Sequence, residues 1–184
     1  MKRILLAVFL LAACREEKPP LPAPVALSVE AVGHYCQMNL LEHDGPKAQV
    51  HLLGFTGRPL FFSQVRDAVA YARLPEQSAT VLGIYVNDMG AAGATWQQPG
   101  TRNWINAETA LFVVGSRQAG GMGADELIPF GDQAAAQAFI AANGGQVFAL
   151  GDVPDTAVFG EDQPVENSDG DDYMARLQRL KGEN

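Results

Sequence analysis

The sequence predicts an α+β fold built from two copies of a small ββαβ unit. A phenylalanine, a capping-type residue and an alanine-rich helix occur at residues 62–71 and again, 68 residues later, at 130–139. Strand-like runs flank both helices, so each unit can pack one helix on one face of a small antiparallel or mixed sheet. We expect the first unit at residues 26–90, and a linker with the second unit at 91–155.

In the first unit, strands are predicted at residues 35–42, 48–55 and 80–86, with Asp44-Gly45-Pro46 as the turn between the first two. The helix is expected to begin at Ser63, a residue type that caps helix N-termini. Its apolar positions Ala68, Tyr71 and Ala72 follow the i, i+3, i+4 spacing of a helix face that packs on a sheet.

In the second unit, strands are predicted at residues 104–115, 126–130 and 146–150, after a linker rich in glycine, alanine and proline. Asp132 is the expected cap of the intervening helix, and Gly144-Gly145 the signal that ends it. The same i, i+3, i+4 spacing recurs here, which supports a duplication.

The N-terminus has the form of a bacterial lipoprotein signal peptide. Residues 1–13 have a basic start and an apolar run, and Leu11-Ala12-Ala13-Cys14 matches a lipobox. Cleavage would leave Cys14 as the lipidated first residue of the mature protein, and Arg15 after it favours the outer membrane. The alternative is an ordinary secretory signal with an incidental cysteine.

The segments outside the two units are polar. Residues 14–25 carry charges and then prolines, which favours an extended tether between the lipid and the folded part. Residues 156–184 are expected to form an acidic C-terminal tail. The net charge of −8 and the lack of a Lys/Arg cluster argue against nucleic-acid binding. The one long apolar run has about ten residues, too few for a membrane span.

The candidate metal ligands gather in one stretch of the chain. Cys36 and Met38 lie within the 18 positions that hold all three histidines, His34, His43 and His51. If lipid takes Cys14, Cys36 has no disulfide partner. On a regular strand Cys36 and Met38 would face the same side, and soft sulfur donors favour Cu(I) over Zn(II), Mg(II) or Ca(II). The alternative is that both are buried core side chains.

A second soft donor is Met122, which glycines surround in Gly120-Gly121-Met122-Gly123. Such a loop presents its side chain, although a flexible loop with an incidental methionine is also compatible. The chain has no nucleophile motif, no phosphate-binding glycine loop and no carboxylate pair outside the tail. We therefore expect a binding protein and not an enzyme.

The stretch Tyr35-Cys36-Gln37-Met38-Asn39, followed by Glu42-His43-Asp44-Gly45-Pro46-Lys47, resembles the metal-binding motif of the NosL family, lipoprotein accessory factors of nitrous oxide reductase. The order of further motifs agrees over residues 11–155: the lipobox, Trp104-Ile105-Asn106-Ala107 and Met122-Gly123. The resemblance implies a membrane-anchored, periplasm-facing Cu(I) chaperone. It would deliver copper to apo nitrous oxide reductase, or to its maturation partners, for the multicopper sulfide centre.

The resemblance also implies a duplicated ββαβ fold, similar to a domain of organomercurial lyase, and a ligand set. Cys36 and Met38 match the motif, Met122 matches a later family methionine, and His43 precedes the Gly-Pro-Lys turn. The chain departs from the family pattern at Gln37, where many members have glycine. Two other functions stay open: a periplasmic scaffold for reductase maturation with Cys36 structural, and a lyase-like enzyme, for which one mature cysteine is too few.

Overall fold

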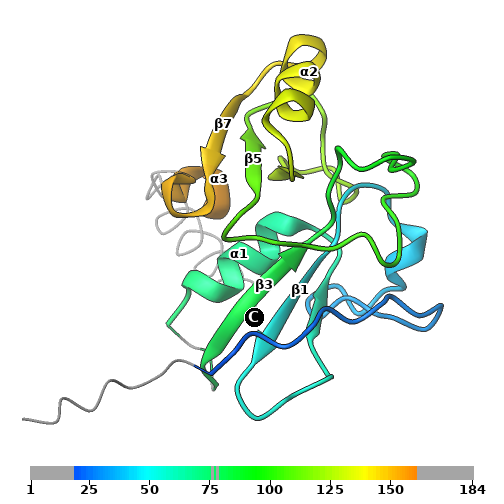
Figure 1. Ribbon diagram of the computed structural model, residues 1–184, viewed down its shortest axis with the longest axis vertical. Coiled ribbons are helices and arrows are strands. Elements are labelled where there is room, and N and C mark those ends of the chain that lie inside the picture. The colour runs from blue at the N-terminus through cyan, green and yellow to red at the C-terminus, as the bar shows by residue number, and fades with distance from the viewer. Residues whose placement is uncertain (1–18, 76, 78, 161–184) are drawn as a thin grey trace, which may run out of the picture.

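The computed structural model describes residues 19–75, 77 and 79–160, which form two small sheets with a helix on each (Figure 1). The predicted signal peptide, the predicted lipidation site Cys14 and tail residues 161–184 lie outside the described residues. Within the described part, no helix has both the length and the apolar character needed to cross a bilayer.

The first sheet has the order β2-β1-β3-β4, and every pair is antiparallel. Its strands are β1 (Ala48–Leu52), β2 (Leu60–Phe62), β3 (Val81–Val86) and β4 (Ile105–Asn106). All of β1 is buried, because it is a central strand flanked by β2 and β3. Helix α1 (Val65–Arg73) connects β2 to β3 and packs on the sheet through Val65, Ala68 and Val69.

The second sheet has the order β6-β5-β7, again antiparallel. It contains β5 (Leu111–Val114), β6 (Ile128–Phe130) and β7 (Gln146–Ala149), and α2 (Gln133–Asn143) connects β6 to β7. Both units therefore have the order ββαβ, and in both the first strand lies between the other two. The single strand predicted at residues 104–115 is wrong, because its start, β4, pairs with β3 in the first sheet and its end, β5, belongs to the second. The α+β fold predicted from the sequence is confirmed.

One hydrophobic core joins the two units. Val50, Val69 and Val86 of the first unit belong to the same buried cluster as Phe112 and Leu127 of the second. Two short helical segments follow β7: a 3-10 turn, Leu150–Asp152, and α3 (Asp155–Phe159), whose Val158 enters this core. Residues 156–159 of the predicted tail therefore belong to a packed helix.

The strand predicted at residues 35–42 is wrong. Gly33 N–H donates to the Met38 carbonyl at 3.0 Å and Gln37 N–H to the Gly33 carbonyl at 2.9 Å, which closes a tight turn instead. Gln37 takes φ +55°, the left-handed region that favours glycine. A 3-10 turn follows at Leu40–Glu42, capped by the Asn39 side chain. In the first unit β2 takes the place of the missing strand.

Of the two predicted helix N-caps, Asp132 is confirmed and Ser63 is wrong. Asp132 caps α2 as expected, since its carboxylate accepts from the amides of Ala134 and Ala135, and Gly144 ends that helix. Ser63 does not cap α1, whose N-cap is Gln64 without a side-chain bond. The acceptor for the first amides of α1 comes from Glu126 of the second unit.

Part of the predicted tether lies on the first sheet, where Figure 1 shows the N-terminal segment in blue crossing β1 and β3. The Tyr85 hydroxyl donates to the Pro22 carbonyl at 3.0 Å. The Gln49 side chain donates to the Val25 carbonyl and accepts from its N–H. Leu21 covers Gly83, where a Cβ would lie 2.8 Å from its methyl group. Residues 21–25 are thus held against the sheet.

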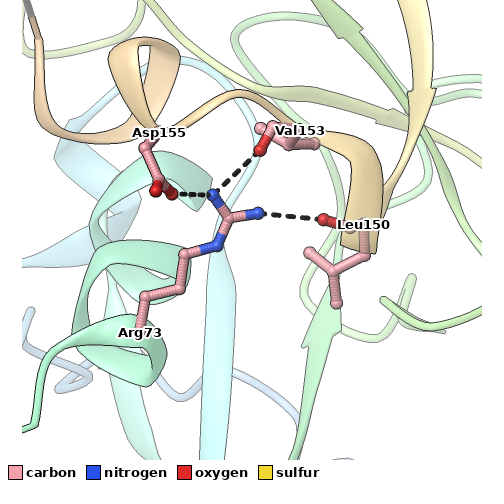
Figure 2. A network of polar contacts seen from close by, with 4 residues as sticks. All are labelled: Arg73, Leu150, Val153 and Asp155. Carbon is pink, nitrogen blue, oxygen red and sulfur yellow. Dashed lines mark hydrogen bonds and ion pairs between the residues drawn. The ribbon is translucent and has the colours of Figure 1, made fainter.

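Arg73, at the end of α1, ties the C-terminal turns to the first unit (Figure 2). Its guanidinium donates to the carbonyls of Val153 and Leu150 at 2.9 and 3.0 Å, and to the Asp155 carboxylate at 2.8 Å. The Arg73 side chain is 24% exposed and that of Asp155 is 78% exposed. The two carbonyl bonds are therefore expected to matter more than the ion pair.

We expect Arg73→Met to lower the free energy of unfolding by about 1.5 to 3 kcal/mol, because it removes hydrogen bonds to a charged donor. Asp155→Ala should cost no more than about 1 kcal/mol, as for other exposed ion pairs. Urea unfolding of both variants measures the difference. Equal losses would contradict this ranking.

Candidate metal centre

Cys36 lies in the turn that replaces the predicted strand. Its thiol is half-buried, has no disulfide partner and donates to Ser63 Oγ at 3.6 Å. Gly33 allows this position, because a Cβ there would lie 2.5 Å from Cys36 Sγ. Ser63 is buried. The residue expected to cap α1 thus contacts the candidate copper thiol instead.

Met38 closes the same turn and is 39% exposed. The prediction that Cys36 and Met38 share one side of a strand is wrong, because both belong to the hydrogen-bonded turn Gly33–Met38. The turn is anchored underneath by a small apolar cluster of Leu27, Ala31 and Leu40. Neither sulfur belongs to a described core cluster, so the alternative of two core side chains is not what the structure has.

Met122 lies on a glycine turn of the second unit and is 41% exposed. The turn is closed by Gly123 N–H to the Gly120 carbonyl at 2.8 Å and by Gly120 N–H to the Ala124 carbonyl at 2.7 Å. Gly121 lies so close to the backbone of Asp44 that a Cβ would overlap the Asp44 carbonyl oxygen. The loop of the second unit is therefore packed on the first unit.

A second contact of this loop is with the start of α1. A Cβ on Gly120 would lie 2.5 Å from Nε2 of Gln64, which directly follows the Ser63 that contacts Cys36. The loop that carries Met122 thus touches the first unit on both sides of the candidate site, at the turn after His43 and beside Ser63. Sequence spacing gives no sign of these two contacts, because they are nonlocal.

The three histidines have separate environments. His34 is exposed and its ring packs edge-on against Phe62 and Tyr71. His51 is buried in β1, bonds to Gln49 Oε1 at 2.9 Å, and burial lowers its pKa below the ordinary 6.5. His34 thus takes part in an aromatic cluster, and His51 has a structural partner in Gln49.

His43 is half-buried and its Nε2 is fully buried without a hydrogen-bond partner among the described residues. It lines a cavity of about 320 Å³ together with Leu27, Leu40 and linker residues 97–101. Among the described residues, no hydrogen bond joins the His43 ring to Cys36, Met38 or Met122. His43 is the weakest of the four candidate ligands.

Two buried charges beside the site were missed by the sequence analysis. Lys47 is 1% exposed, and burial lowers its pKa from 10.5 to about 8, partly offset by nearby Glu126, Asp44 and Cys36. Glu126 is 4% exposed, and burial raises its pKa from 4.5 to about 7 although three backbone amides donate to it. Two features of the sequence could have pointed to these residues. Lys47 ends the Gly-Pro-Lys motif, and Glu126 is a single acidic residue directly before an apolar run.

The donors on these loops suit a soft monovalent ion. The described residues contain no group of three or more His, Cys, Asp or Glu side chains that could hold a metal ion, as a typical zinc site requires. What the loops offer is one thiol and two exposed thioethers, which are donors that select Cu(I). The candidate donors therefore match Cu(I) better than Zn(II).

Comparison with known proteins gives consistent results. The family model described as NosL matches residues 24–158. The chain is 56% identical over 179 residues to the copper-binding lipoprotein NosL of Achromobacter cycloclastes, covering 95% of this chain and 91% of that protein. It is 30% identical over 140 residues to the protein of the same name from Stutzerimonas stutzeri, covering 76% and 70%.

The crystal structure of the copper chaperone NosL from Shewanella denitrificans matches with a TM-score of 0.66 and 30% identity, over 73% of this chain and 97% of that one. The names of these relatives describe binding proteins and no catalysed reaction, in agreement with the expectation from the sequence. With a family model that covers most of the chain and a relative more than half identical over nearly its whole length, the chain belongs to the NosL family.

Proposed function

We propose that this chain binds one Cu(I) ion through Cys36, Met38 and Met122 and delivers it for assembly of the multicopper sulfide centre of nitrous oxide reductase. The observation that carries the proposal is the contact of Gly121 with the Asp44 backbone. That contact seats the methionine loop of the second unit on the segment that holds the Cys-x-Met turn. The names of the relatives, copper-binding lipoprotein and copper chaperone, support the choice of metal.

The donor set fits transfer and not permanent storage. A thiolate supplies the negative charge that holds Cu(I), and two neutral thioethers complete the shell with bonds that exchange easily. Met38 and Met122 are exposed, so an incoming ligand from a partner can replace one thioether at a time. Cys36 is half-buried and would be the last donor to leave.

The proposal extends to location. The lipobox and the lipoprotein names of the relatives support a lipid anchor at Cys14 and a periplasm-facing copper site, with the outer membrane favoured by Arg15. Delivery to nitrous oxide reductase also requires an exported protein, because the partner must reach the same compartment. His43, the fourth candidate from the sequence, is not part of this ligand set, because its Nε2 is buried.

Anaerobic titration of the fragment 19–184 with Cu(I) against a competing chelator tests metal binding. We expect one tightly bound Cu(I) per chain, with Zn(II) bound weakly or not at all, because the candidate donors are soft sulfurs. The fragment lacks Cys14, so Cys36 is its one cysteine and no second thiol contributes to the measured copper stoichiometry. No tight Cu(I) binding would favour the scaffold alternative, in which Cys36 is structural.

Delivery is tested in a denitrifying strain without this chain. Nitrous oxide reductase purified from it should lack copper in the sulfide centre, and wild-type chain should restore the metal while Cys36→Ser should not. Full copper content without the chain would contradict delivery. Restoration by Cys36→Ser would separate a scaffold role from copper transfer.

Met122→Ala is expected to weaken Cu(I) binding and to leave the apo protein nearly as stable as wild type. An exposed loop methionine has little packing to lose, so the loss in unfolding free energy should stay below about 1 kcal/mol. A buried methionine would cost about 2 to 5 kcal/mol instead. Met89, partly buried against the second core cluster, is the matched control. Normal copper affinity in Met122→Ala would remove this residue from the site and leave His43 as the next candidate.

A further inference from the structure

Lys47 is a buried charge that the proposed copper site does not use. It is 1% exposed, and no carboxylate of the described residues forms an ion pair with it. Its ammonium instead donates to the carbonyls of Asp44 and Gly45 at 2.9 and 2.5 Å. Burying an ammonium without a paired carboxylate is costly. The two hydrogen bonds of the ammonium fix the backbone of the turn between His43 and β1.

That turn is fixed from several sides. The Lys47 backbone exchanges hydrogen bonds with Asn87, whose side chain accepts at 2.8 Å and whose N–H donates at 3.0 Å. Gly45 N–H donates to the Trp96 carbonyl at 2.6 Å, and the Trp96 ring covers Gly45 at φ +81°. The turn is thus a rigid seat where the first unit, the linker and the Lys47 side chain meet.

The loop of Met122 rests on this seat. Gly121 approaches the carbonyl oxygen of Asp44, the same atom that accepts from Lys47 Nζ. The ammonium therefore helps to fix the direction of this carbonyl, beside the backbone contacts of Asn87 and Trp96. If the carbonyl turned, the surface that Gly121 contacts would change, and the loop would shift with it.

We propose that Lys47 is a positioning residue of the copper site. It touches no metal; it fixes the Asp44 carbonyl, on which Gly121 seats the loop, and thereby aligns Met122 with the Cys-x-Met turn. This inference rests on the proposed function for its copper consequence, but its structural part can be measured without metal.

The metal-free test uses NMR of methyl-labelled methionine and of backbone amides in the copper-free fragment. Lys47→Leu is expected to shift the Met122 methyl and the Gly121 amide and to leave the Met89 methyl unchanged. Arg58→Leu, which removes an exposed positive charge from the β1–β2 connection, should shift neither. Leucine is chosen because methionine would add a thioether. Unchanged signals of Gly121 and Met122 in Lys47→Leu would overturn the proposal.

The copper test is a double-mutant cycle. Lys47→Leu should weaken Cu(I) binding by about 10- to 100-fold, as for other residues that orient metal ligands. If Lys47 acts through Met122, the double variant with Met122→Ala should bind no more weakly than Met122→Ala alone. Additive losses would show that Lys47 acts elsewhere. Lack of copper binding by wild type would refute the proposed function, while the NMR result would still decide the positioning role.

Gly121→Ala tests the same seat if Lys47→Leu does not fold. The added Cβ cannot fit against Asp44, so the loop must lift, and Cu(I) binding should weaken about as much as in Met122→Ala. Gly151→Ala is the matched control, since a Cβ there meets open space. Wild-type copper affinity in Gly121→Ala would overturn the proposal.

Discussion

Cys36→Ser is expected to weaken Cu(I) binding by more than about 100-fold, beyond the range of residues that only orient a ligand. Cys36 is the one cysteine of the described residues, so no other thiol there can replace it. Serine keeps the size of the side chain but offers a hard oxygen that suits Cu(I) poorly. Competition titration at fixed chelator concentration measures the change.

The matched control for this variant is Ser63→Ala. It removes the hydroxyl that contacts Cys36 Sγ and keeps the thiol, so the loss should be about tenfold. Both variants should unfold within about 1 kcal/mol of wild type, because the contact they remove is long and only partly buried. Cys36→Ser with affinity close to that of Ser63→Ala would contradict the assignment of the thiolate.

Glu126→Ala is expected to cost about 3 kcal/mol or more of unfolding free energy at pH 5. The Glu126 side chain accepts from the amides of Val65, Arg66 and Leu127 at 3.2, 2.9 and 2.8 Å. Each buried donor left without an acceptor costs about 1 to 3 kcal/mol. Asp132→Ala, which removes the exposed cap of α2, should cost only about 1 kcal/mol. Equal losses of unfolding free energy in Glu126→Ala and Asp132→Ala would contradict the proposal that Glu126 links the second unit to α1 of the first.

The same residue makes stability depend on pH. Burial raises the pKa of Glu126 from 4.5 to about 7, so the folded protein holds this proton more tightly than the unfolded chain does. Its contribution is therefore fully present below pH 4.5 and is lost as pH rises through about 7. The stability advantage of wild type over Glu126→Gln should shrink by about 3 kcal/mol over that range. Chemical unfolding at several pH values measures it, and a constant difference would contradict the shifted pKa.

Much of the fold follows from local signals in the sequence. Asp132 and Gly144 mark the ends of α2. An alternation of apolar and polar residues marks β1 and an apolar run marks β3, because caps and strand patterns act over a few residues. The errors arise where distant residues decide. The turn at residues 33–38 is bonded to a distant strand, since His34 N–H donates to the Phe61 carbonyl, and α1 takes its cap from 60 residues away.

For the candidate site, too, the sequence predicts the local chemistry but not the contacts between distant residues. Soft donors and a glycine-flanked methionine are visible in the sequence as chemistry, so Cys36, Met38 and Met122 could be selected. The contact between their loops could not be predicted, because Gly121 and Asp44 are distant in sequence. The burial of Lys47 beside this contact could not be predicted either, since lysine is ordinarily exposed. The position of His43 in the motif makes it a candidate ligand. That its Nε2 is buried is visible only in the structure.

The central claim is that sulfur donors from both units hold one Cu(I) ion. X-ray absorption at the copper edge of the Cu(I)-loaded fragment tests it directly, with wild type compared against Met122→Ala and His43→Ala. We expect a first shell of sulfur that loses one scatterer in Met122→Ala and is unchanged in His43→Ala. A shell that is identical in wild type and Met122→Ala, or an imidazole contribution that disappears in His43→Ala, would contradict the site described here.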